Sequence, residues 1–206
     1  MIEVRYMSEQ PVRKVLNVGG NSKDIPLPSQ YNGWQHVLLD IDPRGNPDII
    51  CDARELTGLC GHEYDAVYCS HNLEHYYRHD VRRVLQGMAH VLKVDGLLDI
   101  RVPDIDALMK IVVEKKMDID DFLYVSPAGP ITVRDVIYGY GVEIERSGQD
   151  FFAHKTGFSP KALTKLLNEC GFPIVFIGLG FIEIVAFAFR NQPSDYIKNL
   201  FTLHTE

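Results

Sequence analysis

The sequence has no excess of positive charge and no concentrated basic segment. Its 206 residues include 21 lysines and arginines against 28 aspartates and glutamates, which gives a formal net charge of −7. The basic stretches, such as EKK and RHDVRR, are short and mixed with acids. Nucleic-acid-binding domains usually present a basic face, so we expect no nucleic-acid partner.

The sequence also lacks closely paired cysteines. Its four cysteines, Cys51, Cys60, Cys69 and Cys170, show no C-x-x-C spacing. The chain start does not have the pattern of a signal peptide. Together these features predict reduced thiols in a cytoplasmic protein.

No apolar run is long enough to be a convincing membrane span. The longest, Pro173–Phe189, is slightly short, contains Glu183 and is interrupted by Gly178 and Gly180. β-branched and aromatic residues dominate it, which favours two adjacent strands joined by a glycine-containing turn. We therefore expect no membrane association.

The remaining sequence alternates short apolar runs with segments of helical spacing. The apolar runs predict strands at 12–20, 36–42, 48–53, 64–70 and, after a turn, 95–103; the spacing predicts helices at 78–93 and 159–172. For the last helix, Ser159 is the expected N-cap and Gly171 the stop. Such alternation is typical of an α/β fold with a doubly wound, mostly parallel sheet. The length suits a single domain over 1–206.

Ligands of doubly wound sheets bind at the carboxyl ends of the strands, and the polar residues and glycines of this sequence gather there. Glycines allow close backbone approach, Asp40 is placed to accept hydrogen bonds from a ribose diol, and Asp52 could accept from an adenine amino group. The alternative roles are a tight turn for the glycines, loop capping for Asp40 and the N-cap of the following helix for Asp52. The positions after the five strands are, in order, Gly19 and Gly20, Asp40 and Asp42, Asp52, Ser70 and His71, and Pro103 and Asp104.

These segments resemble the motifs of the class I S-adenosylmethionine-dependent methyltransferases, and the resemblance covers most of the chain. The subgroup that is most similar consists of small bacterial-type enzymes, some of which are thought to act in sugar or surface-polysaccharide pathways. The resemblance implies a Rossmann-like seven-stranded sheet with helices on both faces and an antiparallel last strand. The segments are KVLNVGG, LLDIDP, CDA, YDAVYCSHNLEHY, VLKVDGLLDIRVPD and HKTGFSPKALTKLLNECGF.

The resemblance further implies methyl transfer from S-adenosylmethionine to a small molecule or sugar-type acceptor. The D/N-P-P-Y signature of amino-group nucleic-acid methylases is absent after the fourth strand, where CSHN stands. His71, Asp104 and His154 are candidates for a catalytic base, with a structural role as the alternative for His154. The implied cofactor-binding residues are Gly19, Gly20, Asn21, Asp40, Ile41, Asp52, Ala53, Ser70 and His71.

The segment 104–156 has no clear place in the sheet and is expected to be a substrate-side insertion. Two helices are predicted within it, in ALMKIVVEKK and TVRDVIYGYG. Its aromatic residues could line an acceptor pocket or pack in a core; they include Tyr138, Tyr140, Phe151 and Phe152.

Two features depart from the family pattern. Asn17 stands where an acid is usual, and the glycine motif is reduced to NVGGNSKD. Pro26 and Pro28 also make a long helix after this loop unfavourable. A non-catalytic nucleoside-binding module on the same fold is therefore the alternative function.

The stretch HNLEH, His71–His75, fits the H-x-x-E-H pattern of zinc peptidases. Those enzymes carry the motif well inside a long helix, whereas here a predicted strand ends at the preceding residue. No residue further along the sequence can be recognised as the third metal ligand. Zinc hydrolysis is therefore the weaker alternative and no metal is expected: His71 should face the cofactor cleft, and His75 should fix the loop through a buried hydrogen bond.

Overall fold

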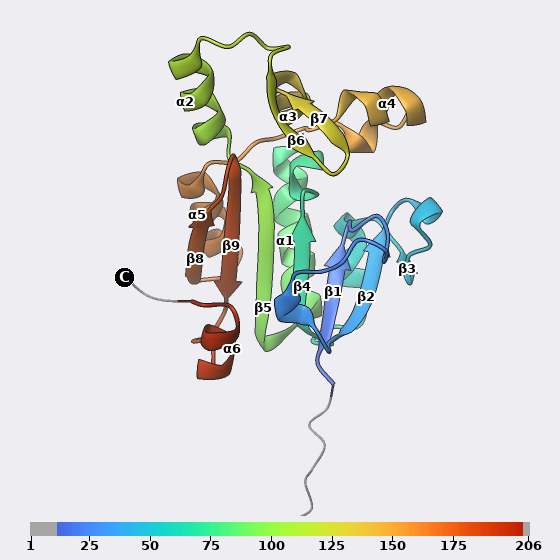
Figure 1. Ribbon diagram of the computed structural model, residues 1–206. Helices are drawn as coiled ribbons and strands as arrows, with labels where there is room; N and C mark the ends of the chain where they lie inside the picture. Colours follow the sequence, from blue (N-terminus) through green and yellow to red (C-terminus); the bar gives the residue numbers. More distant parts are fainter. Residues whose placement is uncertain (1–11, 204–206) are drawn as a thin grey trace, which may run out of the picture.

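A computed structural model describes residues 12–203, and its centre is a seven-stranded sheet in the order β3-β2-β1-β4-β5-β9-β8 (Figure 1). The first five strands in this order are parallel, whereas β9 is antiparallel to both β5 and β8. The predicted mostly parallel sheet with an antiparallel last strand is confirmed. The strands are β1 Lys14–Val18, β2 Gln35–Asp40, β3 Ile49–Ile50, β4 Tyr64–Ser70, β5 Leu92–Pro103, β8 Ile174–Leu179 and β9 Glu183–Phe189.

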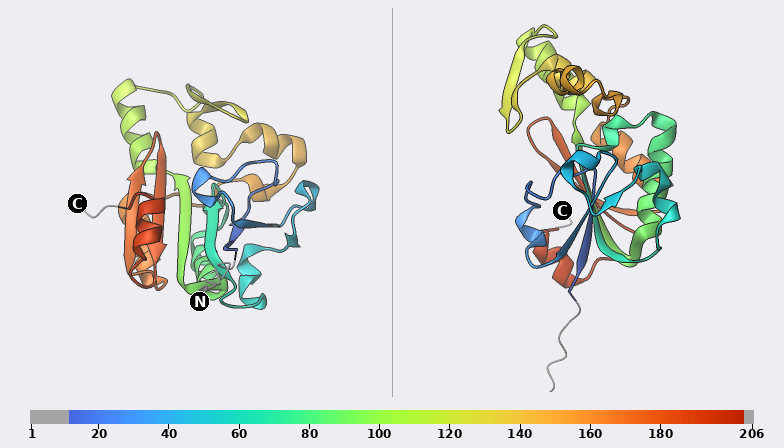
Figure 2. Two further views of the ribbon diagram at one scale, coloured as in Figure 1. Left: turned by 60° about the horizontal axis from the view of Figure 1, so that its bottom comes forward. Right: turned by 90° about the vertical axis from the view of Figure 1, so that its right-hand side faces the viewer.

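Helices cover both faces of the sheet (Figure 2). One face packs against α1 (Arg78–Val91), α5 (Pro160–Glu169) and the 3-10 helix η3 (Ala53–Gly58). The apolar residues of α1 recur at helical spacing and are buried in this core, as the sequence predicts. The other face is covered by α6 (Asp195–Leu200) and the short 3-10 helix η1 (Ser29–Tyr31).

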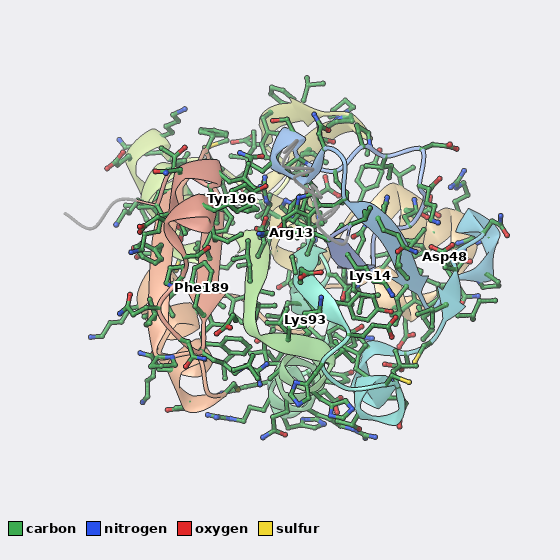
Figure 3. All side chains as sticks on the ribbon, turned by 90° about the horizontal axis from the view of Figure 1, so that it is seen from below. Arg13, Lys14, Asp48, Lys93, Phe189 and Tyr196 are labelled. Carbon is green, nitrogen blue, oxygen red and sulfur yellow. The ribbon has the colours of Figure 1, made fainter. Side chains whose placement is uncertain are left out.

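The loop after β1 contains only η1 before β2 begins, so the predicted absence of a long helix there is confirmed. The start of β1 is tied to α6 by the guanidinium of Arg13, which lies 4.2 Å from the ring centroid of Tyr196 (Figure 3). Trp34 lies on the same guanidinium at 5.5 Å. These cation–π contacts join the start of β1 to α6 and to the segment just before β2.

The predicted turn before the fifth strand differs in the structure. β5 begins at Leu92, directly after α1, and its pairing with β4 jumps from Tyr64↔Leu92 to Ala66↔Leu97. The exposed residues 93–95 therefore form a bulge inside the strand. The bulge turns the chain, so no separate loop is needed.

The last helix and the last two strands follow the sequence prediction. The Ser159 hydroxyl accepts the N–H of Ala162 at the start of α5, and Gly171 after its end has a φ of +94°. β8 and β9 form a hairpin whose turn includes Gly180. Within residues 12–203, no helix combines the length and the apolar character needed to cross a membrane.

The segment after β5 lies beyond the carboxyl ends of the parallel strands (Figure 1). Both predicted helices are present, and between them lies a hairpin that was not predicted. A small core of Leu108, Ile131, Val136 and Ile182 holds it together. Its elements are α2 Ile105–Lys115, β6 Phe122–Ser126, β7 Gly129–Thr132, α3 Val133–Tyr138, α4 Gly141–Ser147 and the 3-10 helix η5 Asp150–Phe152.

Candidate functional site

A cavity of about 410 Å³, here called the main cavity, lies at the carboxyl ends of β1, β2, β3 and β4. Because parallel strands end at one edge of the sheet, residues from four separate loops meet there. Asp150, Phe151, Phe152 and Lys155 from the end of the insertion complete its wall. Six of the predicted cofactor residues line it: Gly19, Asn21, Asp40, Ile41, Asp52 and His71.

The other predicted cofactor residues lie nearby or are buried. Gly20 and Ser70 line an adjoining cavity of about 180 Å³, which shares Gly19 and Asn21 with the main cavity. Ala53 is 2% exposed and lines neither of these cavities.

Two asparagine side chains fill the space next to Gly19 and Gly20 in the loop after β1. Gly19 has a φ of +72°, and a Cβ there would lie 2.1 Å from Nδ2 of Asn72. A Cβ on Gly20 would lie 2.1 Å from Nδ2 of Asn17. Gly19 is required because it combines a positive φ with a crowded site, whereas a side chain at position 20 would have to displace the amide of Asn17. Asn72 was not predicted, and nothing local in the sequence marks it.

Asp40 organises the loops around the main cavity. Its carboxylate is largely buried and accepts two backbone N–H groups, from Asn21 at 2.8 Å and from Asp42 at 2.8 Å. The first of these bonds holds Asn21 in a left-handed conformation with φ of +61°. A carboxylate has about four acceptor sites, so lone pairs remain for a ligand hydroxyl.

Two further acids on the cavity each pair with an arginine two residues later. The side chain of Arg44 holds the pKa of Asp42 below its usual value. Burial raises the pKa of Asp52, but the hydrogen bonds from Arg54 lower it by more. Asp52 also accepts the N–H of Arg54 as the N-cap of η3, so the capping alternative is confirmed, and its predicted contact with adenine stays a prediction.

The main cavity is rich in acids. Five aspartates line it against Arg54, Lys155 and the ring of His71. Such walls favour a ligand that carries positive charge and hydroxyl or amino donors. The five are Asp40, Asp42, Asp52, Asp80 and Asp150.

His71 follows β4 directly and lines the main cavity, as predicted. Its Nε2 lies 3.0 Å from Oε1 of Glu183, and its Nδ1 lies 3.5 Å from Oε1 of Glu74. Burial lowers the pKa of His71, but the two carboxylates raise it by more, to about 10. At neutral pH the half-exposed ring is therefore an imidazolium, which donates hydrogen bonds and cannot accept a proton.

The HNLEH stretch forms a single 3-10 turn, Leu73–His75, instead of the long helix of a zinc peptidase. His75 lies within hydrogen-bond distance of two carbonyl oxygens, that of Ala153 at 3.2 Å and that of His71 at 3.1 Å. The backbone N–H groups of Lys155 and Thr156 both donate to the carbonyl of Glu74. His75 therefore contacts the loop as predicted, although these contacts are part-buried and exposed and not buried, and the loop is tied to the end of the insertion.

His154 does not line the main cavity but lies beside Glu74 and His75. Its Nδ1 lies 2.9 Å from the carbonyl oxygen of Val136, and its Nε2 lies 3.9 Å from Oε1 of Glu74. Burial lowers the pKa of His154. The structural alternative proposed for this residue matches its contact with α3.

Asp104 is placed differently from the prediction. Its Oδ1 accepts the N–H groups of Asp106 at 3.0 Å and Ala107 at 3.1 Å, which makes it the N-cap of α2. It is 5% exposed and is not among the residues that line the main cavity. An acid after a strand can serve a ligand or the next helix, and here it caps the helix.

The aromatic residues of the insertion are divided among three places. Phe151 and Phe152 line the main cavity. Tyr140 and Phe152 line a second, more open cavity of about 890 Å³, here called the outer cavity, which shares Asn21 and Asp42 with the main one. Tyr138 lines neither and is 56% exposed.

Comparison with known proteins supports the resemblance seen in the sequence. Residues 13–100 match a family model described as a methyltransferase domain. The matched segment runs from the start of β1 into β5 and contains the strand-end residues of the main cavity up to His71. No curated protein matches the chain.

Solved structures share the fold at low sequence identity. An S-adenosylmethionine-dependent methyltransferase from Archaeoglobus fulgidus is 17% identical, with 86% of each chain covered and a TM-score of 0.55. A possible histamine N-methyltransferase from Thermotoga maritima is 14% identical, with 88% of this chain and 84% of that chain covered and a TM-score of 0.55. An O-methyltransferase family protein from Burkholderia thailandensis is 12% identical, with 89% and 52% covered and a TM-score of 0.51.

Proposed function

We propose that this chain is a methyltransferase that moves a methyl group from S-adenosylmethionine to a small-molecule or sugar-type acceptor. The observation that carries the proposal is the main cavity, where Gly19, Asp40, Asp52 and His71 meet at the carboxyl ends of four strands. The match of residues 13–100 to a methyltransferase domain supports it.

The residues present fit the cofactor's groups. Asp40 would accept hydrogen bonds from the ribose hydroxyls, and Asp52 would accept from the adenine amino group. Ile41 lines the cavity and is 44% exposed, so it offers apolar surface to the base. The acid-rich wall complements the positive charge of the sulfonium and ammonium groups.

The bound cofactor supplies an electrophilic methyl group, and the protein's task is to align an acceptor with it and to exclude water. Phe151 and Phe152 cover the main cavity from the insertion side. His71 is held as an imidazolium by its hydrogen bond to Glu183 and by the nearby charge of Glu74, so we assign it to orienting the ligand and not to removing a proton.

The acceptor would enter from the outer cavity. This cavity shares Asn21, Asp42 and Phe152 with the main cavity, and α4 of the insertion forms its far wall. Its size of about 890 Å³ suits a small molecule or a sugar. The net charge of −7 disfavours a nucleic-acid acceptor.

A nucleoside-binding module without turnover is the second candidate. It is favoured by the side chain of Asn72, which occupies the space next to Gly19 on the cavity wall. A loop filled in this way could hold the nucleoside while giving the methionine end little room.

Calorimetric titration with S-adenosylmethionine and S-adenosylhomocysteine tests binding, and transfer of a labelled methyl group to a panel of sugars and small metabolites tests turnover. Methyltransferase activity requires both binding and transfer. Binding of either compound without transfer to any acceptor would favour the module. No binding at millimolar concentration would rule out both candidates.

A further inference from the structure

The carboxylate of Glu74 is buried among histidines, yet neither of its oxygens has a hydrogen-bond partner among residues 12–203. Its side chain is 1% exposed. The nearest ring nitrogens to Oε1 are His71 Nδ1 at 3.5 Å and His154 Nε2 at 3.9 Å, both beyond ordinary hydrogen-bond length. A buried carboxylate without a hydrogen bond is costly, and the imidazolium of His71 balances its charge only from 3.5 Å, so both oxygens are left free to bind a further cation.

His154 presents an electron pair to the same space. Its Nδ1 lies 2.9 Å from the carbonyl oxygen of Val136, and a carbonyl only accepts, so Nδ1 carries a proton. In the neutral ring the lone pair is then on Nε2, which is directed toward Glu74. Metal-bound histidines have this arrangement, with the second ring nitrogen donating to a backbone carbonyl.

His75 completes a set of three donors. One ligand atom from each of Glu74, His75 and His154 lies within 4.8 Å of the other two. Both ring nitrogens of His75 now face carbonyl oxygens, so one of them must release its carbonyl to bind a metal. The bond to the other carbonyl would then orient the ring in the same way as Val136 orients His154.

We infer that Glu74, His75 and His154 form a binding site for a divalent transition-metal cation of the zinc type. Two imidazoles and one carboxylate are a donor set typical of such ions. Metal–ligand distances of about 2.0–2.2 Å require the three atoms to draw together to roughly 3.4 Å in a tetrahedral site. The side chains, and not the sheet, would make this adjustment.

Three protein ligands leave the coordination sphere open, as in metal sites that bind a further molecule. Of the three residues, His75 also lines the main cavity, so a metal bound here would lie at the cavity wall. The sequence argument against a zinc peptidase rested on the missing long helix and on the missing third ligand. His154, near the end of the insertion, supplies a third ligand. The site is unlike that of a peptidase because its first two ligands, Glu74 and His75, are consecutive in a 3-10 turn.

The test measures metal binding alone and does not depend on the proposed methyl transfer. Full-length, tag-free protein is stripped with a chelator and titrated with Zn²⁺ in competition with a chromophoric chelator, and with Co²⁺ by visible absorption. We expect one ion per chain and Co²⁺ bands that indicate nitrogen and oxygen ligands in a site of low coordination number.

Glu74→Gln and His154→Gln should each weaken Zn²⁺ binding by more than the roughly 10–100-fold that outer partners of metal sites cost. His79→Ala is the control, because His79 is 79% exposed, lies 3.5 Å from Asp80 and could bind a stray ion at the surface. This variant should bind like the wild type. The circular dichroism of the metal-free variants shows whether they are folded.

The inference is overturned if the wild type binds no stoichiometric ion at millimolar Zn²⁺, if both folded glutamine variants keep wild-type affinity, or if His79→Ala removes the binding. If Glu74→Gln destabilises the protein and the wild type binds no metal, Glu74 serves only as the ion-pair partner of the His71 imidazolium.

Discussion

Asp40 is expected to have two separable functions, and the substitution Asp40→Asn distinguishes them. Each carboxylate oxygen accepts one backbone N–H, from Asn21 and from Asp42, both at 2.8 Å. Asparagine has only one side-chain oxygen, so one of these amides would face an NH₂ group instead of an acceptor. Hydrogen bonds to charged groups contribute about 1.5–3 kcal/mol, and the free energy of unfolding should fall by about this amount.

Affinity for the cofactor should fall as well, if Asp40 also binds the ribose. Losing a charge-assisted contact of about 1.5–3 kcal/mol corresponds to roughly 10- to 150-fold weaker binding. Urea unfolding without ligand measures the first effect. Titration calorimetry well below the unfolding transition measures the second on folded protein.

Asp48→Asn is the matched control. The carboxylate of Asp48 also accepts a backbone N–H group, that of Leu38 in β2 at 2.7 Å, and it pairs with Lys23 in the loop after β1. Yet it lines neither the main nor the outer cavity. Asp48→Asn should lower stability and leave affinity unchanged. If both variants weaken binding equally, or if Asp40→Asn binds like the wild type, Asp40 only supports the loop and the ribose contact is wrong.

Three further predictions concern burial and packing. Burial raises the pKa of Asp99 to about 6 against an ordinary 3.8, so ionisation of this side chain should destabilise the fold. The unfolding free energy of Asp99→Asn relative to that of the wild type should therefore rise by about 3 kcal/mol between pH 4 and pH 6 and stay level above pH 6. Urea titrations that show a constant difference across this pH range would refute the prediction. A Cβ on Gly45 would lie 1.6 Å from the backbone oxygen of Asn21, whereas a Cβ on Gly58 would point into open space. Gly45→Ala should therefore lower the free energy of unfolding by about 1–3 kcal/mol, and Gly58→Ala is the control that should leave it unchanged. Hydrogen exchange in 104–156 should be faster than in β1, β2 and β4, because its small core consists of three buried residues and Ile182 from the turn between β8 and β9. Uniform protection would mean that the insertion is fixed.

The edge of the sheet that carries the main cavity could be predicted because parallel strands impose it. Once the strands were read from their apolar runs, the residues after each strand had to lie at one edge. Gly19, Asp40, Asp52 and His71 were found in this way, although they are far apart in the sequence. No knowledge of side-chain packing was needed.

Contacts between distant segments could not be predicted, because nothing local encodes them. His71 meets Glu183 across 112 positions, and Glu183 appears in the sequence only as an acid in an apolar run. Asn72 next to Gly19 and His154 next to Glu74 are of the same kind. For Asp104 the sequence predicted a catalytic base, whereas its side chain caps the helix that follows it.

The contacts at the two ends of the insertion determine where it can move. At its end, the carbonyl of Glu74 accepts two backbone N–H groups, from Lys155 and Thr156. At its start, the N–H of Asp104 donates to Ile182, and the N–H of Ile105 donates to Phe158. Both ends are thus held to loops at the edge of the sheet, so we expect the cavities to open from the middle of the segment, where α4 faces the loop after β1 across the outer cavity. The residues closest to the proposed metal site would stay fixed while the acceptor side opens.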